Sequence, residues 1–495
     1  MQPLLNYFFM PCLFLIAGVL LGNGNIQAQQ ADRELPQKID LSAAISLALA
    51  KNFAVQIERI DVEIAGKQVE SAKGAYDPNF QADYISSVNK STPDSLDTRS
   101  EFDSLVTRLN GNLSSGANYT LTLANDESRF SSEDFLSNYE ADASIRLRQP
   151  LLRNFRIDNT RFNIRVAQKG SQIADWDYRN QLINTVTQTI NAYSNLNFAQ
   201  ANLDVVIKSR ELAEILVNDN RKRVELGRMA ESNIITAESQ LKFREERVLF
   251  AERLLKESQN QLKLLISDEI EALINWNIEA LPLATPSYRE TNPATDYAIA
   301  LENRPDYQQA LLGHDIDALT ARNRKNQALP SLDLTYSYAL QGSGDDFEQS
   351  FRQLGVQNDD AYSVGAVFSL PLGNRTRRAQ AKVAQMELQQ TEINLERQKQ
   401  FILVSLDSAA YRVEKSWERI QVSKSTRELA EKSLEAEEKK LKAGTGFTFR
   451  VLDLQTELAN AQVGELQAIA DYYRDLAEYD RQTGATLDHH NISVD

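Results

Sequence analysis

Hydrophobic residues occupy every second position in four short segments of the chain. These segments lie at about 78–87, 139–149, 332–340 and 362–370. A period of two predicts strands with one apolar and one polar face. Two further short segments, at 105–113 and 119–123, predict an extra hairpin within residues 100–127, between the first and second strands.

Long helices are predicted on either side of these strands. An opening helix is expected over 41–73, and the tracts 151–281 and 372–495 contain no proline. Within the second tract, apolar positions at Ile402, Leu406, Ala409 and Val413 are separated by steps of four, three and four residues. This spacing is typical of a coiled-coil seam, and an unbroken helix over 377–442 would be roughly 100 Å long. The sequence therefore predicts an elongated helical rod.

The two halves of the chain share this order of elements. At an offset of 252 residues Pro78 aligns with Pro330, and at an offset of 217 residues Gly227 aligns with Gly444. The distance from a VAQ motif to this glycine is the same in both halves, which indicates an internal duplication. Each repeat is expected to run helix, strand, strand, long helix, glycine break, helix. We divide the chain into a first repeat at 29–281, a second repeat at 282–485 and a polar C-terminal tail at 486–495.

The N-terminal segment is an apolar run that ends in small and polar residues, with Ala28 at a plausible cleavage position. We interpret residues 1–28 as a secretory signal peptide, the alternative being a transmembrane anchor. The chain's only cysteine, Cys12, lies within this segment. Cleavage would leave a mature chain without thiols, which excludes cysteine catalysis and cysteine-based zinc sites.

Composition argues against nucleic-acid binding and catalysis. The formal net charge is −15, whereas phosphate recognition needs clustered Lys and Arg. His314 is isolated, and the pair His489 and His490 is expected in a solvated tail, so we predict no metal site. No phosphate loop or nucleophile elbow is present. We expect no enzyme activity and no cofactor.

Three motifs together resemble those of the TolC-like outer-membrane efflux protein (OEP) family. They are the two strand-to-helix junctions RLRQPLLRN and FSLPLGNRT, and the glycine-break stretch KAGTGFTFRVLDLQTELANAQ. The resemblance extends over about 41–484. It implies a mainly α protein with membrane β structure: a homotrimer in which each chain gives about four strands to one 12-stranded transmembrane β-barrel. The barrel is continued by a coiled-coil tunnel of 12 helices across the periplasm. It also implies location in the outer membrane with a periplasmic extension.

The resemblance further implies sites and partners. Gly227 and Gly444 would mark the helix-hairpin tips where a periplasmic adaptor docks, and Asp453 would face the pore axis at the periplasmic aperture. Arg450 stands where the family often has a second aspartate. It could pair with Asp453 three residues on or lie on the surface. Four prolines mark the junctions between strands and helices: Pro78, Pro150, Pro330 and Pro371. The expected partners are the adaptor, an inner-membrane transporter of RND or ABC type, and outer-membrane lipid.

Strand number gives an independent argument for oligomerisation. Four strands cannot close a barrel, and open strand edges are not tolerated in lipid. We therefore predict an exit duct for efflux or type I secretion, with the extra hairpin as an elaboration at one rim or, alternatively, as an enlargement of the barrel. Two alternatives remain: a small soluble sheet packed on helices, and a non-conducting structural coiled-coil protein of the envelope.

Overall fold

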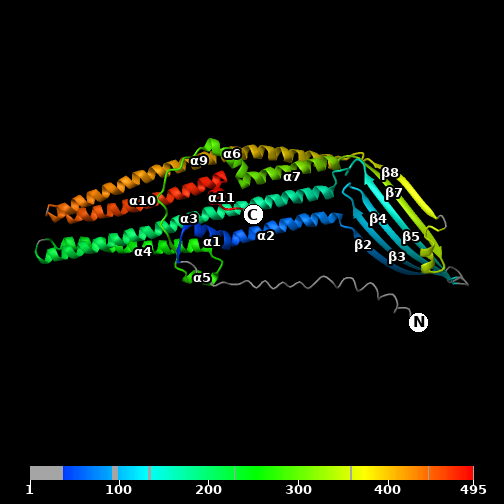
Figure 1. Ribbon diagram of the computed structural model, residues 1–495, viewed down its shortest axis with the longest axis horizontal. Helices are drawn as coiled ribbons and strands as arrows, with labels where there is room; N and C mark the ends of the chain where they lie inside the picture. The colour runs from blue at the N-terminus through cyan, green and yellow to red at the C-terminus, as the bar shows by residue number, and fades with distance from the viewer. Residues whose placement is uncertain are drawn as a thin grey trace, which may run out of the picture. The chain divides into compact units, whose positions relative to one another are not determined.

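The computed structural model describes residues 37–91, 98–131, 135–227, 229–356, 359–443 and 445–493. The expected signal peptide lies outside these residues. The described chain is mostly helical and contains one large sheet (Figure 1).

The order of elements repeats between the halves. The first half contains α1 (Leu41–Lys51), α2 (Phe53–Lys73), β2 (Asn79–Ser91), β3 (Thr98–Asn112), β4 (Asn118–Ser131), β5 (Phe135–Pro150), α3 (Asn159–Glu225) and α4 (Ser232–Ile266). The second half contains α6 (Pro293–Asn303), α7 (Pro305–Gln327), β7 (Ser331–Gly344), β8 (Asp360–Ser369), α9 (Arg375–Lys442) and α10 (Thr448–Thr483). Shorter elements are β1 (Lys38–Ile39), η1 (Gly74–Tyr76), α5 (Ile270–Asn275), β6 (Glu279–Ala280), α8 (Phe347–Arg352) and α11 (Thr486–His489). This order agrees with the expected duplication, apart from β3 and β4.

The opening helix is not continuous, contrary to our prediction. Asn52 separates α1 from α2 with an extended backbone, φ −65° and ψ 124°. Its N–H donates to the Ala48 carbonyl, and its side-chain oxygen accepts from the Ala54 N–H at 2.9 Å. Asparagine is favoured at such a position because its short side chain can satisfy the free N–H groups of the next helix. The break therefore has a local cause that the apolar periodicity alone did not reveal.

The sheet has six strands in the order β2-β3-β4-β5-β7-β8, all neighbours being antiparallel. The sheet therefore has six strands, whereas about four strands per chain, with a separate extra hairpin, were expected. The extra hairpin is not a rim elaboration, because β3 and β4 lie inside the sheet between β2 and β5. Both strands also extend farther than predicted, since residues 98–104 and 124–131 are paired although they are largely polar.

One face of the sheet carries an apolar row that crosses every strand. Residues directly opposite one another in antiparallel strands share a face. The row consists of Phe80, Leu109, Leu121, Ile145, Tyr338 and Tyr362. The adjacent row points to the other face and is polar throughout: Asn79, Asn110, Thr120, Arg146, Ser337 and Ser363. On that polar face, Arg108 pairs with Asp83 at 2.6 Å and Arg148 pairs with Asp333 at 2.7 Å.

The long helices form two hairpins. The helix α3 (67 residues) packs on α4, and α9 (68 residues) packs on α10 (Figure 1). Each long helix is roughly 100 Å from end to end at 1.5 Å per residue, as predicted for 377–442. None of the helices in the described parts of the chain combines the length and apolar content required to span a bilayer.

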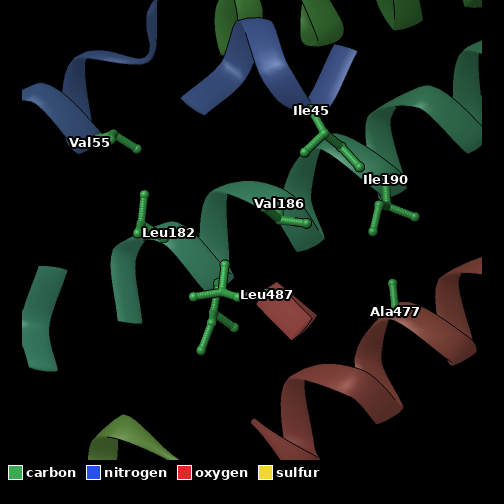
Figure 2. Close-up of a cluster of buried hydrophobic side chains, with 8 residues drawn as sticks. Ile45, Val55, Leu182, Val186, Ile190, Ala477 and Leu487 are labelled. Atoms are coloured by element: carbon green, nitrogen blue, oxygen red, sulfur yellow. The ribbon is translucent and has the colours of Figure 1, made fainter. Parts of the chain in front are cut away.

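A hydrophobic cluster ties the N-terminal helices to the end of the chain. Figure 2 shows Ile45 and Val55 packed around Val186 of α3, with Ala477 of α10 and Leu487 of α11. Leu487 is only 1% exposed, and Ile492 packs against the same cluster. The prediction of a solvated tail at 486–495 was therefore wrong for these residues, because two apolar side chains within a polar stretch are enough to anchor it.

Candidate functional site

The turn between α3 and α4 depends on glycine. Gly227 has φ +66° and directly follows Leu226, the C-cap residue of α3. This left-handed conformation is most favourable for glycine, which has no Cβ atom, so the predicted glycine break is present at this turn. Gly444, its predicted counterpart, lies outside the described residues.

The α9–α10 turn depends on a glycine that sequence reasoning missed. A Cβ atom added to Gly446 would lie 2.6 Å from the backbone nitrogen of Leu441, and the Gly446 N–H donates to the Lys440 carbonyl at 3.1 Å. Any side chain would force the turn open. The motif KAGTGF contains both glycines, and its regular spacing from the VAQ motif drew attention to the first alone.

Both tips expose large apolar side chains. Leu226 and Ile235 flank the α3–α4 turn, Phe447 and Phe449 flank the α9–α10 turn, and each is between 67% and 77% exposed. Exposed apolar residues that cluster in this way mark interaction surfaces more often than chance. The tips therefore present a surface suited to another apolar partner.

Arg450 and Asp453 form an ion pair, which is one of the two arrangements that the sequence left open. Arg450 Nη1 lies 2.7 Å from Asp453 Oδ2, and both side chains are about half exposed. Asp453 also lines a groove between α4 and α10, together with Phe243 and Phe449. Such an exposed pair contributes about 1 kcal/mol or less to stability. The pair therefore places two neighbouring opposite charges within the first two turns of α10 but contributes little to stability.

A buried cation, Arg244, connects the two hairpins close to this pair. Arg244 lies on α4 and is 3% exposed. Its Nη2 donates to the Leu452 carbonyl at 3.1 Å and to Thr456 Oγ1 at 3.2 Å, both on α10. Its Nη1 donates to Gln455 Oε1 at 3.1 Å and to the Ser209 carbonyl of α3 at 2.8 Å. Burial lowers the pKa of the guanidinium, and the nearby Arg247 lowers it further.

No acidic group is among the hydrogen-bond partners of Arg244. A buried charge that relies on neutral acceptors is costly unless the acceptors are held in place. The surrounding cluster provides this rigidity, because it brings together residues of α3, α4, α9 and α10. Its buried members are Leu216, Val217, Ala237, Leu434, Val451, Leu452 and Leu454.

Sequence reasoning missed Arg244, although the sequence contained a signal. On α4, Ala237, Leu241, Val248 and Ala251 are apolar and inward, and Arg244 falls between them at the same alternating spacing of four and three. A basic residue in a coiled-coil seam has to find polar partners on a neighbouring helix. Recognising Arg244 as a basic residue within this seam would have predicted hydrogen bonds to a neighbouring helix at this position.

The predicted prolines lie where strands meet helices. Pro78 and Pro330 directly precede β2 and β7, Pro150 ends β5, and Pro371 follows β8 by two residues. Left-handed residues then reverse the chain, Asn154 with φ 68° after β5 and Asn374 with φ 43° before α9. Both are bonded to the end of α7: the Asn154 N–H donates to Asn326 Oδ1 at 2.8 Å, and Asn374 Nδ2 donates to the Ala328 carbonyl at 2.7 Å.

Within the described ranges, no group of three or more His, Cys, Asp or Glu residues could hold a metal ion. His489 Nδ1 instead lies 2.9 Å from Asp480 Oδ1, and Arg289 pairs with the same carboxylate at 2.8 Å. His314 lies 3.9 Å or more from the nearest carboxylate oxygens. The tips therefore remain the candidate functional site.

Comparison with known proteins agrees with this geometry. Residues 297–485 match the family described as outer membrane efflux protein. A curated relative, the outer membrane protein TolC of Escherichia coli K12, is 24% identical over 302 residues, which is 60% of this chain and 60% of TolC. The structure is similar to that of the CmeC outer membrane channel of Campylobacter jejuni, with a TM-score of 0.66 and 15% identity over 90% of this chain and 86% of CmeC.

A third similar structure is VceC, an outer membrane protein of Vibrio cholerae. It has a TM-score of 0.65 and 15% identity, over 90% of this chain and 96% of VceC. The family match falls in the second half of the chain, and the structural matches cover 90% of the chain and so extend over both halves. Residues 297–485 thus match the outer membrane efflux protein family, and the described chain shares the fold of the CmeC and VceC outer membrane proteins.

Proposed function

We propose that this protein is the outer-membrane exit duct of a tripartite efflux or type I secretion system. The observation that carries this proposal is the apolar row that crosses all six strands, on a sheet that leads into two helices of roughly 100 Å, α3 and α9. Each of these helices forms a hairpin with a shorter helix. A sheet that is apolar on one face and polar on the other suits a wall between lipid and water. The hairpins would extend the water-filled path into the periplasm.

The duct would be a homotrimer. Within the described chain, β2 and β8 each pair on one side only. Unpaired N–H and C=O groups are not tolerated in lipid, so the two edges must find partners. A second and a third copy supply them, with the apolar face toward lipid and the polar face toward the lumen.

The hairpin tips would form the closed periplasmic entrance. Three copies of Asp453 near one axis would attract cations, and the Arg450–Asp453 pair would moderate that charge. A periplasmic adaptor would dock on the exposed apolar tips, and an inner-membrane transporter of RND or ABC type would supply the energy. Opening would separate the hairpins around Gly227 and the α9–α10 turn.

Single-channel recording in planar bilayers tests this proposal. The purified protein should give small, cation-preferring currents. Asp453→Asn should reduce the cation preference measured from the reversal potential, because three carboxylates are lost near the axis. Glu457→Gln removes an exposed charge one turn farther along α10 and is the matched control, with a smaller effect expected.

The alternative function, a non-conducting structural coiled-coil protein, predicts no currents at all. Absence of conductance in every preparation, including one with Arg450→Ala to disturb the aperture, would favour that alternative. Copurification of an adaptor and loss of export in a deletion strain would support the duct.

A further inference from the structure

We propose that three copies of this chain close a single barrel of eighteen strands, by pairing β8 of each copy with β2 of the next. This rests on the proposed trimeric duct and specifies its partner surface and its width. Twelve strands, the number that the family resemblance implies, would leave β3 and β4 unused.

The hairpin β3–β4 is built as part of a membrane wall. The pairing of β2 with β3 runs from Asn79 opposite Asn110 to Ser91 opposite Thr98, over the full length of β2. The pairing of β4 with β5 is equally complete. The apolar face also continues through the hairpin, with Leu105 and Leu109 on β3 and Leu121 and Leu123 on β4. A hairpin outside the barrel would not contact lipid through this apolar face.

The slant of the sheet matches barrel closure. The row that starts at Asn79, the helix-side end of β2, reaches β8 at Ser363, six residues before that strand ends at Ser369. The strand ends therefore shift by six residues over five strand-to-strand steps. With a rise of about 3.3 Å per residue and a strand separation of about 4.8 Å, this corresponds to a tilt of roughly 40°. Closed membrane barrels have tilts of about 35–45°.

The free edges fit one another in only a few registers. The apolar faces of β2 and β8 both use even-numbered residues, so a continuous apolar wall requires even residues to face even residues. Continuing the observed slant places Ala366 of one copy opposite Ala82 or Tyr84 of the next. The first register also sets Phe368 against Phe80, and both rings are exposed by more than 60% in the single chain.

Eighteen strands make the barrel as wide as the tunnel below it. At 40° tilt, eighteen strands close a ring of about 36 Å between backbones, and twelve strands a ring of about 24 Å. Twelve helices spaced about 8–10 Å apart form a ring of roughly 31–39 Å. The wider barrel thus continues the tunnel without narrowing. Allowing about 5 Å for inward side chains, it would pass cargo up to about 25 Å across, including polypeptides, so that only the tips select by size.

Electron microscopy of the detergent-solubilised full-length protein tests the inference. Top views should show trimers with a barrel about 36 Å across, and the deletion of residues 98–131 should narrow it by about one third. This deletion joins β2 to β5 and keeps the strands antiparallel, so it is the matched four-strand control. A wild-type trimer with a twelve-stranded barrel would overturn the inference and leave the proposed duct intact. Wild-type protein without trimers would overturn both.

Disulfide trapping provides a second measurement that does not depend on the deletion folding. In a Cys12→Ser background, Ala366→Cys combined with either Ala82→Cys or Tyr84→Cys should give covalent trimers on oxidation. Intrachain Leu123→Cys with Ala143→Cys should form within the same trimers, because these residues are opposite in β4 and β5. Covalent trimers that lack the intrachain bond would mean that the hairpin has left the wall, and would overturn the inference.

Discussion

Replacing Arg244 with alanine is expected to make the duct open far more often. The substitution removes three hydrogen bonds from α4 to α10, at 3.1, 3.1 and 3.2 Å. At a net value of about 1 kcal/mol per bond, the closed arrangement loses about 3 kcal/mol. If opening separates α4 from α10, these bonds are already broken in the open state. The open-to-closed ratio should therefore rise on the order of 100-fold.

The assay is the open probability of single channels in planar bilayers. Arg247→Ala is the matched control, because Arg247 lies three residues away on α4 and makes one exposed bond to Asn460 at 3.2 Å. It removes the same charge but only one connection, so its effect should stay within a few-fold. Arg244→Lys keeps the charge with fewer donors and should fall between the two. Equal open probabilities for Arg244→Ala and Arg247→Ala would refute the view that Arg244 joins the hairpins in the closed state.

Three further outcomes follow from local structure. Leu487→Ala should reduce the free energy of unfolding by about 2–5 kcal/mol, because it leaves a cavity in a well-packed cluster, whereas exposed Leu429→Ala should change the melting temperature little. Burial is the main cause that lowers the pKa of His490 below its usual value of 6.5. The unfolded chain therefore binds this proton more tightly, and the free energy of unfolding should fall as pH drops below about 6.5. If the melting temperature of His490→Gln fell with pH as steeply as that of the wild type, this expectation would be contradicted. Gly227→Ala should destabilise by about 1–2 kcal/mol because of its positive φ, while Gly170→Ala, in open space within α3, should stabilise by up to about 1 kcal/mol, as measured by thermal denaturation.

The long helices could be predicted because their apolar positions repeat over many turns. The limits 377–442 agree with those of α9 to within two residues, since a seam of this length leaves few alternative interpretations. The break at Asn52 could not be predicted in this way, because the periodicity continues across it and only the capping geometry reveals it.

The lengths of β3 and β4 were underestimated for a different reason. Their central residues alternate, but toward the far end the face that carries Leu105 and Leu109 becomes polar, as at Glu101 and Asp103. Arg129, which pairs with Glu101 at 3.4 Å, holds these polar residues in register across the ladder. The alternation of apolar and polar residues therefore identified the apolar central segments of β3 and β4 but missed the polar extensions of both strands. Arg244 was missed because a single charge in a seam was treated as part of an exposed helix face.

The position of Leu487 has a consequence for the order in which the chain folds. A polypeptide that crosses an envelope emerges with its N-terminal part first, so α1 and α2 arrive long before the segment that contains Leu487. Until then the hydrophobic cluster around Val186 lacks the side chain of Leu487. Contacts between residues this far apart in sequence also form slowly. A chain arrested before this residue would keep an apolar hole that proteases and holdases can recognise. The burial of Leu487 is therefore expected to be one of the last steps in the folding of the exported chain.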